Sequence, residues 1–474
     1  MGYIQRNYRL LSMLSGPTAF AVVFFLAKDT FAYKGSLAIA TTIWMALWWV
    51  LRPVNVSVTA LIPIPINALF NLIPMNQIIS QYFSEIIILL LGADIICLTW
   101  HSSGLDRRLS VKTLCLIGTS MKQQIAVWLS VATVLSMFLP NVVVCTILVP
   151  IAVSMLKFIG EEDIKSSKIA VPILLAIVWG AGIGGFGTPI GGAANLVAIN
   201  YIEGISGHEL MYVDWVVRFL PFLLVILALN LLFLFALKLP VEHISGTKSY
   251  FAQMYKELGA LKQSEKISLG LFLAATLLSF ARPLYAELLP GMKPAYVFFT
   301  LSLLTFILND EQGKPLMDWP QAERSIMWGM LFLFAGGLAL GRLVTETGAT
   351  ATIARLISEG NLTGGLGTVF VFTLFACGLS EISSNTAAAA ITVPVVVGIT
   401  TELGLDPIPY LLISIVAFNC AYILPVSIRA IPVGYGLAAN TLLVKGAGLA
   451  TLSAITITTV GYIIMKFWPI FLTL

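Results

Sequence analysis

Long stretches without charged residues most constrain what this 474-residue chain can fold into. From Leu366 to Thr401, 36 residues carry a single charge, Glu381. About 20 apolar residues span a bilayer once, so this segment is too long for one span and too short for two spans plus a turn. A helical hairpin that enters the bilayer partway and turns back fits the length. The segment therefore predicts a re-entrant hairpin.

A polar island at the middle of this segment marks the expected turn. Ser383, Ser384, Asn385 and Thr386 interrupt the apolar sequence, and four alanines follow at 387–390. Because lipid cannot hydrogen-bond the backbone of a turn, this turn must face protein or a water-filled cavity. The alanines allow the two arms of the hairpin to pack closely. The alternative is one long tilted span whose hydroxyl groups bond their own backbone.

Composition places the whole chain among polytopic membrane proteins. Apolar residues make up 58% of it and charged residues 11%, whereas soluble domains carry about 25% charged residues. The chain is long enough for roughly ten crossings or more. The formal net charge of +4 is spread over loops and indicates no nucleic-acid partner. The five cysteines lie in or beside apolar stretches without C-x-x-C spacing, which predicts free thiols.

A second hairpin is predicted at residues 123–156, which carry no charge. This segment is 34 residues long, and Pro140 and Asn141 place a helix-breaking, polar turn at its middle. Residues 169–202 form another charge-free segment of 34 residues. Its run of glycine and proline at 184–192 should unwind the helix and leave two half-helices with free backbone groups between them.

The two halves of the chain correspond to each other. Asn141 and Asn385 lie 244 residues apart, and so do Pro150 and Pro394. A second broken helix is expected within residues 407–444, so each half has a hairpin followed by an interrupted helix. Matching interruptions in two halves are typical of transporters built from inverted repeats, whose substrate binds near the midplane of the bilayer. We therefore expect an all-α polytopic membrane protein with inverted repeats, each containing a re-entrant helical hairpin and a broken transmembrane helix.

Short motifs in both halves resemble the divalent anion/sodium symporter (DASS) family. Residues 384–386, Ser-Asn-Thr followed by alanines, are similar to the hairpin signature of that family, and residues 135–141 resemble its first hairpin. Residues 185–195 resemble the first broken-helix motif, and residues 423–426 resemble the second. The resemblance covers most of the chain, from about residue 100 onward. Members of the family carry succinate, related dicarboxylates and citrate.

The resemblance implies a homodimer in the cell membrane that moves dicarboxylates such as succinate, fumarate, malate and 2-oxoglutarate. It implies a scaffold domain that holds the dimer interface and a transport domain that contains both hairpins and moves like an elevator. The chain would then divide into N-terminal spans at 1–100, mainly scaffold; a first repeat at 101–240; a charged linker at 241–266; scaffold-type spans at 267–345; the second hairpin and broken helix at 346–445; and a C-terminal span at 446–474.

The resemblance also implies where substrate and ions bind. Sodium ions are the one kind of cofactor it suggests, held by backbone and side-chain oxygens at the two hairpin tips. The candidate sodium sites are Ser136, Asn141 and Gly191 in the first half and Ser380, Asn385 and Ser427 in the second. The candidate substrate-binding residues are Asn141, Thr188, Ser384, Asn385, Thr386, Ile428 and Arg429.

Arg429 departs from the family pattern and is the most informative single residue. An arginine within the membrane costs about 2.5–3.5 kcal/mol on insertion scales, so it usually faces a cavity and a partner. Its planar guanidinium matches a carboxylate bidentately, which places it at the substrate. The alternatives are a structural ion pair with Asp94 or Glu381, or snorkelling to an interface. The sequence assigns no role to either acid.

The fixed charge of Arg429 also bears on how transport is coupled. Pro140, Val142 and Ile428 lack hydroxyl groups that the family motifs supply, and a nearby arginine repels a bound cation. A buried arginine without a partner would make the empty carrier reluctant to cross the membrane. The sequence therefore favours sodium-independent exchange of one dicarboxylate for another (antiport), with sodium-coupled dicarboxylate symport as the alternative.

Other functional classes fit the sequence less well. The three histidines, His101, His208 and His243, all lie outside apolar stretches, so neither a buried catalytic histidine nor a zinc site is expected. An enzyme is therefore not predicted, and a channel would need rings of polar or charged residues that the chain lacks. Arg6 and Arg9 precede the first span, which predicts a cytoplasmic N-terminus and, with an odd number of full spans, a C-terminus outside.

Overall fold

The computed structural model consists almost entirely of helices. In the described part of the chain, two isolated β-bridges are the one exception to helices, turns and loops. The expected all-α class is confirmed. The structure describes residues 2–116, 118–165, 167–237, 239, 241–244, 246–349, 352 and 363–471, without the side chains of residues 2–9 and 50. Part of the predicted range 346–445, namely residues 350, 351 and 353–362, lies outside the described residues.

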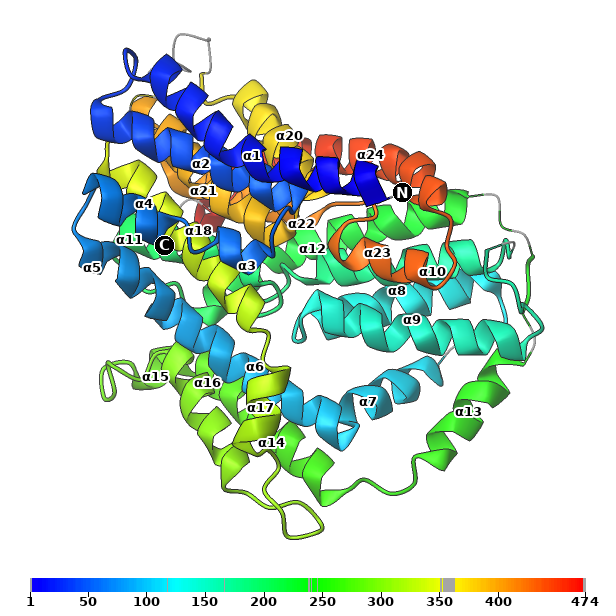
Figure 1. Ribbon diagram of the computed structural model, residues 1–474. Coiled ribbons are helices and arrows are strands. Elements are labelled where there is room, and N and C mark those ends of the chain that lie inside the picture. The colour runs from blue at the N-terminus through cyan, green and yellow to red at the C-terminus, as the bar shows by residue number, and fades with distance from the viewer. Residues whose placement is uncertain are drawn as a thin grey trace.

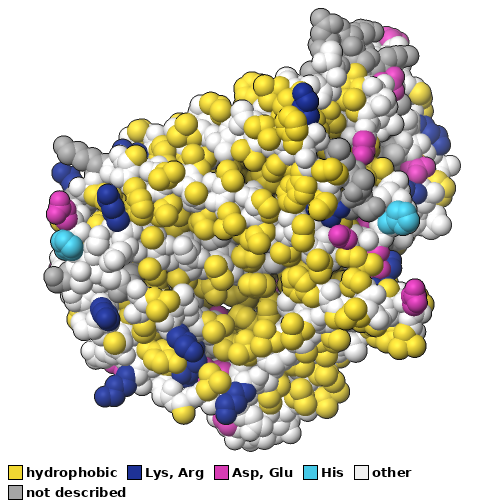
Figure 2. Space-filling model, turned by 180° about the vertical axis from the view of Figure 1, so that it is seen from behind, with side chains coloured by type: hydrophobic (Ala, Val, Ile, Leu, Met, Phe, Trp, Pro, Cys, Tyr) yellow, Lys and Arg dark blue, Asp and Glu magenta, His cyan; other side chains and the backbone are white. Residues whose placement is uncertain are grey.

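Six described helical segments are long and apolar enough to cross a bilayer, and shorter apolar helices accompany them. Apolar side chains cover the middle of the face in Figure 2, and charged side chains lie mostly toward its margins. This distribution suits a protein whose flanks contact lipid, since charged groups are costly within the hydrocarbon core. The six segments are Leu10–Ala27, Met75–Ser103, Asn141–Phe158, Tyr212–Ala236, Trp328–Glu346 and Ala439–Phe467.

Helices of the first half form the centre of the molecule. Figure 1 shows α8, α9, α10 and α12 across the middle of the view. The helix breaks lie where the sequence predicts them, between Ser136 and Asn141 and between Gly184 and Ala193. Return of the hairpin within the bilayer stays a prediction. The helices are α8 (Met121–Ser136), α9 (Asn141–Phe158), α10 (Ala170–Gly184), α11 (Ala193–Ser206) and α12 (Tyr212–Ala236).

Most helices of the second half lie above those of the first half in the view of Figure 1. The predicted polar turn separates α20 from α21 at Ser383 and Ser384. The second broken helix unwinds from Cys420, within the expected range 407–444. The helices are α20 (Leu366–Ile382), α21 (Asn385–Glu402), α22 (Pro407–Asn419), η3 (Ser427–Arg429), α23 (Ala430–Gly434), α24 (Ala439–Phe467) and η4 (Pro469–Phe471).

The N-terminal elements pack against one another and, from α2 to η1, against α18 (Trp328–Glu346). The first helix contains Pro17, and residues 56–74 form short helices and loops, which suits their prolines. Asn71 takes a left-handed φ of 47° between two of the short helices. The elements are α1 (Gly2–Ala27), α2 (Tyr33–Leu51), α3 (Val56–Thr59), α4 (Pro63–Phe70), α5 (Met75–Ile79) and η1 (Ser80–Phe83).

The remaining helices lie below the centre in Figure 1, apart from α18, which runs beside η1 and α21. Residues 101–108 are largely helical, and the charged linker at 241–266 contains a helix of its own. The elements are α6 (Glu85–Ser103), α7 (Leu105–Leu114), α13 (Thr247–Glu257), α14 (Gln263–Phe280), α15 (Arg282–Tyr285), α16 (Pro294–Leu303), η2 (Leu304–Phe306), α17 (Trp319–Ser325) and α18 (Trp328–Glu346).

A buried ion pair joins α7 to the charged linker and to α14. Arg108 of α7 donates to Glu265 of α14 across 2.7 Å, and both side chains are almost fully buried. The same guanidinium donates to the backbone oxygens of Leu258, Gly259 and Ala260, which follow α13. Every charge in this cluster therefore has a partner. These hydrogen bonds and the ion pair hold α7, α13 and α14 together.

Small residues let α8 and α10 approach closely beneath the first hairpin. A Cβ atom at Gly184 would lie 2.2 Å from the carbonyl oxygen of Thr133, and one at Gly180 would lie 2.6 Å from that of Leu129. Two glycines spaced four residues apart on one helix face form the small-xxx-small pattern of close membrane-helix packing. The position of the first hairpin tip therefore depends on this contact.

We expect Gly184→Ala to destabilise the protein, because the added methyl group must push α8 away from α10. The loss should be about 1–3 kcal/mol, the usual cost of overpacking a helix contact. Gly378→Ala on α20 is the matched control, since a Cβ atom there meets nothing within 4 Å. Thermal unfolding of the two purified variants in detergent measures the difference. Equal unfolding temperatures for both variants would show that α8 and α10 are not in such close contact.

Candidate functional site

A cavity lies where three helices begin. Its lining includes Asn141 at the start of α9, Ala193 and Ala194 at the start of α11, and Asn385 and Thr386 at the start of α21. The first turn of a helix has unpaired N–H groups and the positive end of the helix dipole, and both favour an anion. The predicted tips of both hairpins and the second arm of the first broken helix therefore direct positive ends toward one cavity.

The opposite wall of the cavity comes from α6 and α18. It contains Leu90, Ala93, Asp94 and Cys97 of α6 and Met330 of α18. The cavity thus separates the two hairpin tips from helices that the sequence assigns mainly to a scaffold. One charged side chain is present in this lining, and it is acidic.

The structure brings four of the sequence-predicted residues together at the cavity: Asn141, Gly191, Asn385 and Thr386. It places Thr188 and Ser384 at turns instead. The Thr188 hydroxyl donates to the carbonyl oxygen of Met137 and accepts the N–H of Gly191 at 3.1 Å. The Ser384 hydroxyl accepts the N–H of Ala387 at 3.2 Å and caps α21. Both hydroxyl groups are therefore used in shaping the tips.

A chain of amide groups joins the two halves beside the cavity. Asn385 donates to Asn419 (Nδ2 to Oδ1, 3.2 Å), and Asn419 donates to Asn195 (Nδ2 to Oδ1, 3.3 Å). Asn195 in turn donates to the carbonyl oxygens of Gly185 (2.8 Å) and Thr188 (3.0 Å). Asn419 is not among the residues predicted from the sequence. The signal that could have found it is a single amide within an otherwise apolar run, as for Asn195.

Ser136 and Ser380 make corresponding hydrogen bonds in the two halves. Ser136, at the end of α8, donates to the carbonyl oxygen of Ala181 in α10 at 2.7 Å. Ser380, near the end of α20, donates to the carbonyl oxygen of Phe418 in α22 at 2.6 Å. Each serine is fully buried and precedes by five residues the asparagine that begins the next helix. Their role is to tie each hairpin to the broken helix that follows it.

Three backbone carbonyl groups converge beside Gly191 in the first half. A Cβ atom at this glycine would lie 2.8 Å from each of the carbonyl oxygens of Ser136, Met137 and Gly185. Because these residues end α8 and α10, both helices present their negative ends here. Carbonyl groups at the ends of broken helices are the usual sodium ligands of such transporters. We call these three carbonyl groups the Gly191 cradle.

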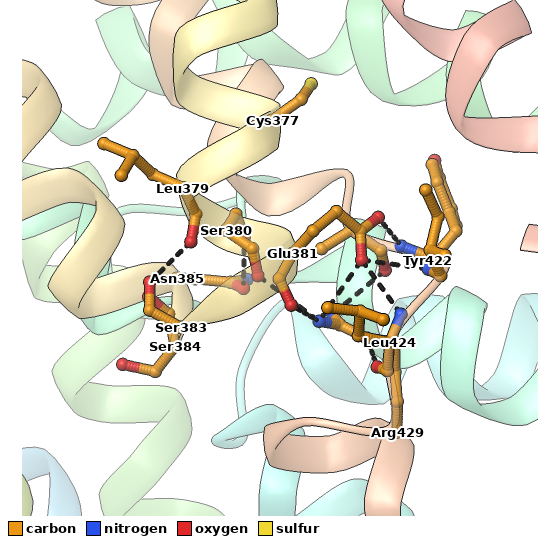
Figure 3. Close-up of polar contacts among 12 residues, drawn as sticks. Cys377, Leu379, Ser380, Glu381, Ser383, Ser384, Asn385, Tyr422, Leu424 and Arg429 are labelled. Atoms are coloured by element: carbon orange, nitrogen blue, oxygen red, sulfur yellow. Dashed lines mark hydrogen bonds and ion pairs between the residues drawn. The ribbon is translucent and has the colours of Figure 1, made fainter. Parts of the chain in front are cut away.

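The second half holds its broken helix with a buried ion pair (Figure 3). The Glu381 carboxylate accepts hydrogen bonds from three consecutive backbone N–H groups, those of Tyr422 (2.5 Å), Ile423 (2.9 Å) and Leu424 (3.2 Å). The Arg429 guanidinium lies 3.5 Å from the same carboxylate (Nη2 to Oε2). We call this pair the Glu381–Arg429 clasp.

The remaining donors of Arg429 go to backbone oxygens. Its guanidinium donates to the carbonyl oxygens of Leu424 (2.6 Å) and Ala421 (3.2 Å) in the unwound segment. It also donates to those of Ser380 (3.3 Å) and Glu381 (3.2 Å) at the end of α20. These last two carbonyl groups correspond, by the 244-residue spacing, to Ser136 and Met137 of the Gly191 cradle. The guanidinium thus bonds the carbonyl groups that correspond to two of the three in the Gly191 cradle, where the first half has only neutral donors, Thr188 and Asn195.

Three residues predicted to bind substrate or sodium lie in the second broken helix. Arg429 is 2% exposed, is not among the residues that line the cavity, and forms the ion pair with Glu381 that the sequence left open as an alternative. Ile428 is likewise buried and away from the cavity lining. Ser427 has a left-handed φ of 55° and begins η3. Substrate binding by Arg429 and Ile428 and sodium binding by Ser427 stay predictions.

We expect Glu381→Gln to lower the free energy of unfolding by about 3–5 kcal/mol, because it leaves the Arg429 charge buried without a counter-charge. Chemical unfolding in detergent measures the loss. Glu346→Gln is the control: its ion pair with Arg342 has side chains 37% and 46% exposed, and such a pair contributes about 1 kcal/mol or less. The double variant Glu381→Gln, Arg429→Leu should lose less than the two single variants combined. Additive losses would mean that the two side chains do not interact.

Comparisons with known proteins agree with a transporter. A family model described as a citrate transporter (CitMHS) matches residues 46–417. The sodium-dependent dicarboxylate transporter SdcS of Staphylococcus aureus is 29% identical in one strain and 28% in another, over 96% of this chain and 91% of the relative. The solved structure of the YdaH transporter of Alcanivorax borkumensis has a TM-score of 0.55 and 12% identity, and covers 85% of this chain and 89% of its own.

The YdaH likeness shows a shared fold, whereas the family match rests on sequence along most of the chain. The resemblance to divalent anion carriers that the hairpin motifs suggested is confirmed. The matched family and the relatives are membrane transporters, not enzymes. The chain belongs to the citrate transporter family of membrane carriers.

Proposed function

We propose that this protein is a secondary transporter that carries dicarboxylates such as succinate, fumarate, malate and 2-oxoglutarate across the cell membrane. The observation that carries this proposal is the convergence of the N-termini of α9, α11 and α21 on one cavity. Three positive helix ends favour a ligand with more than one negative charge. The sodium-dependent dicarboxylate transporters of Staphylococcus aureus, which match 96% of this chain, support the substrate class.

Asn141 and Asn385 are the residues we assign to the two carboxylates. They begin α9 and α21, and both line the cavity. In the described part of the chain, the Asn141 amide has no hydrogen-bond partner, so it is free to donate to a ligand. Thr386 adds a hydroxyl group at the second tip. Thr188 and Ser384 act indirectly by fixing the turns, and Arg429 acts through the Glu381–Arg429 clasp.

We further propose that transport is coupled to sodium, which binds at the Gly191 cradle. The three carbonyl groups of Ser136, Met137 and Gly185 supply oxygen ligands close to the cavity, and Gly191 itself lines it. The expectation of exchange depended on a buried Arg429 whose charge has no partner and repels a cation. Because Glu381 neutralises that charge, the repulsion of a bound cation is weaker than the sequence suggested. The names of the relatives support sodium dependence.

Sodium-independent exchange stays a second candidate for a specific reason. The Arg429 guanidinium donates to the carbonyl groups of Ser380 and Glu381, which leaves those oxygens less free for a second cation near Ser380, Asn385 and Ser427. The fixed positive charge of Arg429 at the second tip thus lowers the number of sodium ions that the carrier can bind. If the carrier binds no sodium at all, exchange is the remaining way to balance the substrate charge.

Assembly and motion follow the family in our proposal. A homodimer would be held by the scaffold, and the two hairpins with their broken helices would move as one transport domain, in the manner of an elevator. The hydrogen bonds that tie Ser136 to Ala181 and Ser380 to Phe418 support such a unit, because they link each hairpin to its broken helix. The N-terminus is proposed to face the cytoplasm and the C-terminus the outside, as the arginines before the first span indicate.

Uptake of labelled succinate into proteoliposomes distinguishes the two forms of coupling. We expect uptake to require an inward sodium gradient and to proceed without internal dicarboxylate, because a mobile cation at the Gly191 cradle balances part of the substrate charge. Four conditions are compared: sodium gradient present or absent, each with and without internal succinate. Uptake that requires internal succinate and does not depend on sodium would show exchange instead of symport. If no dicarboxylate shows saturable uptake in any of the four conditions, the proposed function is refuted.

We expect Asn385→Ala to reduce succinate uptake by at least about tenfold, because it removes a donor at the cavity and breaks the link to Asn419. One hydrogen bond to a charged group is worth about 1.5–3 kcal/mol, which is tenfold or more. The matched control is Asn440→Ala, an exposed asparagine at the start of α24. Both variants should unfold at similar temperatures. Normal uptake by Asn385→Ala would exclude this residue from the site.

A further inference from the structure

The residue that neither the fold nor the proposed function explains is Asp94. It lies on α6, is 5% exposed, and is the one charged residue in the lining of the cavity. One of its oxygens, Oδ2, accepts the backbone N–H of Met327 at 2.9 Å. In the part of the chain that the structure describes, its other oxygen has no hydrogen-bond partner. One carboxylate oxygen of this buried residue thus lacks a protein partner, and the residue lines a cavity suited to anions.

Helix α18 explains how the fold tolerates this charge. Met327 is the N-cap of α18, so Asp94 sits at the positive end of that helix. The interaction favours the ionised carboxylate without neutralising it, since a helix end carries about half an elementary charge. Asp94 therefore keeps a net negative charge on the wall that faces Asn141 and Asn385.

No basic side chain in the cavity lining offsets Asp94, and Cys97 is the other titratable residue there. The elements packed against α6 carry charges that do not line the cavity. Asp106 and Arg108 of α7 and Glu265 of α14 are buried in contacts already made, and Glu323 and Arg324 of α17 are exposed. The remaining charged residues of the elements packed against α6 also lie outside the cavity lining. They are Glu203 of α11, Lys266 of α14, Arg107 and Lys112 of α7, and Arg342 and Glu346 of α18.

We propose that Asp94 is a charge-selecting residue of the transport site, which lets a dianion bind only when a cation is bound at the Gly191 cradle. The inference rests on the proposed function, because it concerns the same cavity. A substrate carboxylate in this cavity comes within several ångströms of Asp94, and two like charges at such a distance repel strongly in a partly buried site. A bound cation at the Gly191 cradle offsets this repulsion, and a monoanion suffers less of it than a dianion.

Asp94 therefore acts on coupling as well as on specificity. Without a cation, the cavity contains a fixed negative charge and rejects the dianion, so the carrier does not load substrate alone. A neutral residue of the same shape removes this condition while keeping the hydrogen bond to Met327. The consequence is a variant that binds the dianion more tightly and at lower sodium concentration than the native protein.

Equilibrium binding to the purified full-length protein tests the inference. The probes are succinate, a dianion at neutral pH, and its monoamide succinamate, a monoanion of the same length, each measured across a range of sodium concentrations. In Asp94→Asn we expect the Kd of succinate at low sodium to fall by roughly 10- to 100-fold and that of succinamate to fall much less. Asp106→Asn is the matched control, since it neutralises a buried carboxylate that does not line the cavity.

Three results would overturn the inference or the proposal beneath it, and they differ. Equal changes for both ligands in Asp94→Asn would mean that Asp94 merely caps α18. If that variant is unstable, the native protein still tests the inference. Its affinity for succinate should then rise more steeply with sodium concentration than its affinity for succinamate. An equal sodium dependence for both ligands refutes the inference. Absence of succinate binding by the native protein at high sodium refutes the proposed function itself.

Discussion

Satisfying the unwound backbone is the constraint on which the rest of this structure depends. A transmembrane helix that breaks leaves N–H and C=O groups without partners, and lipid supplies none. The Glu381–Arg429 clasp meets this need in the second half: the carboxylate takes three successive N–H groups and the guanidinium takes four carbonyl groups. The two charges also neutralise each other. A broken helix at this depth is stable because the ions bond the backbone and each other.

The first half meets the same need without charge. Asn195 and Thr188 bond the carbonyl groups of Gly185, Thr188 and Met137, and the indole of Trp215 donates to the carbonyl of Phe186 at 2.9 Å. No guanidinium reaches the ends of α8 and α10 among the described residues, so the oxygens of the Gly191 cradle meet only neutral donors. The two broken helices therefore differ in charge. Under the proposed sodium coupling, this difference favours the first half as the cation site.

Local features of the sequence were enough to locate the breaks. Prolines, glycines and polar islands within charge-free segments marked the turns before Asn141 and Asn385 and the unwound residues after Gly184. Contacts between distant segments were not visible in the same way. Arg429 and Glu381 lie 48 residues apart and Asn419 and Asn195 lie 224 apart, so their partners emerge only when the halves pack. Likewise, the charged residues of 101–108 and 241–266 lie far apart in the sequence. The burial of Arg108 becomes visible only through its contact with Glu265 of α14.

Charge balance in the cavity links these observations to coupling. The clasp compensates itself, so Arg429 adds no net positive charge for the substrate. What remains are three helix N-termini, each worth about half an elementary charge, against two substrate carboxylates and the carboxylate of Asp94. The helix ends offset only about half of that negative charge. A mobile cation must supply the rest, and the nearby oxygens of the Gly191 cradle are suited to hold one. Under the proposed sodium coupling, the substrate and the cation therefore each favour binding of the other.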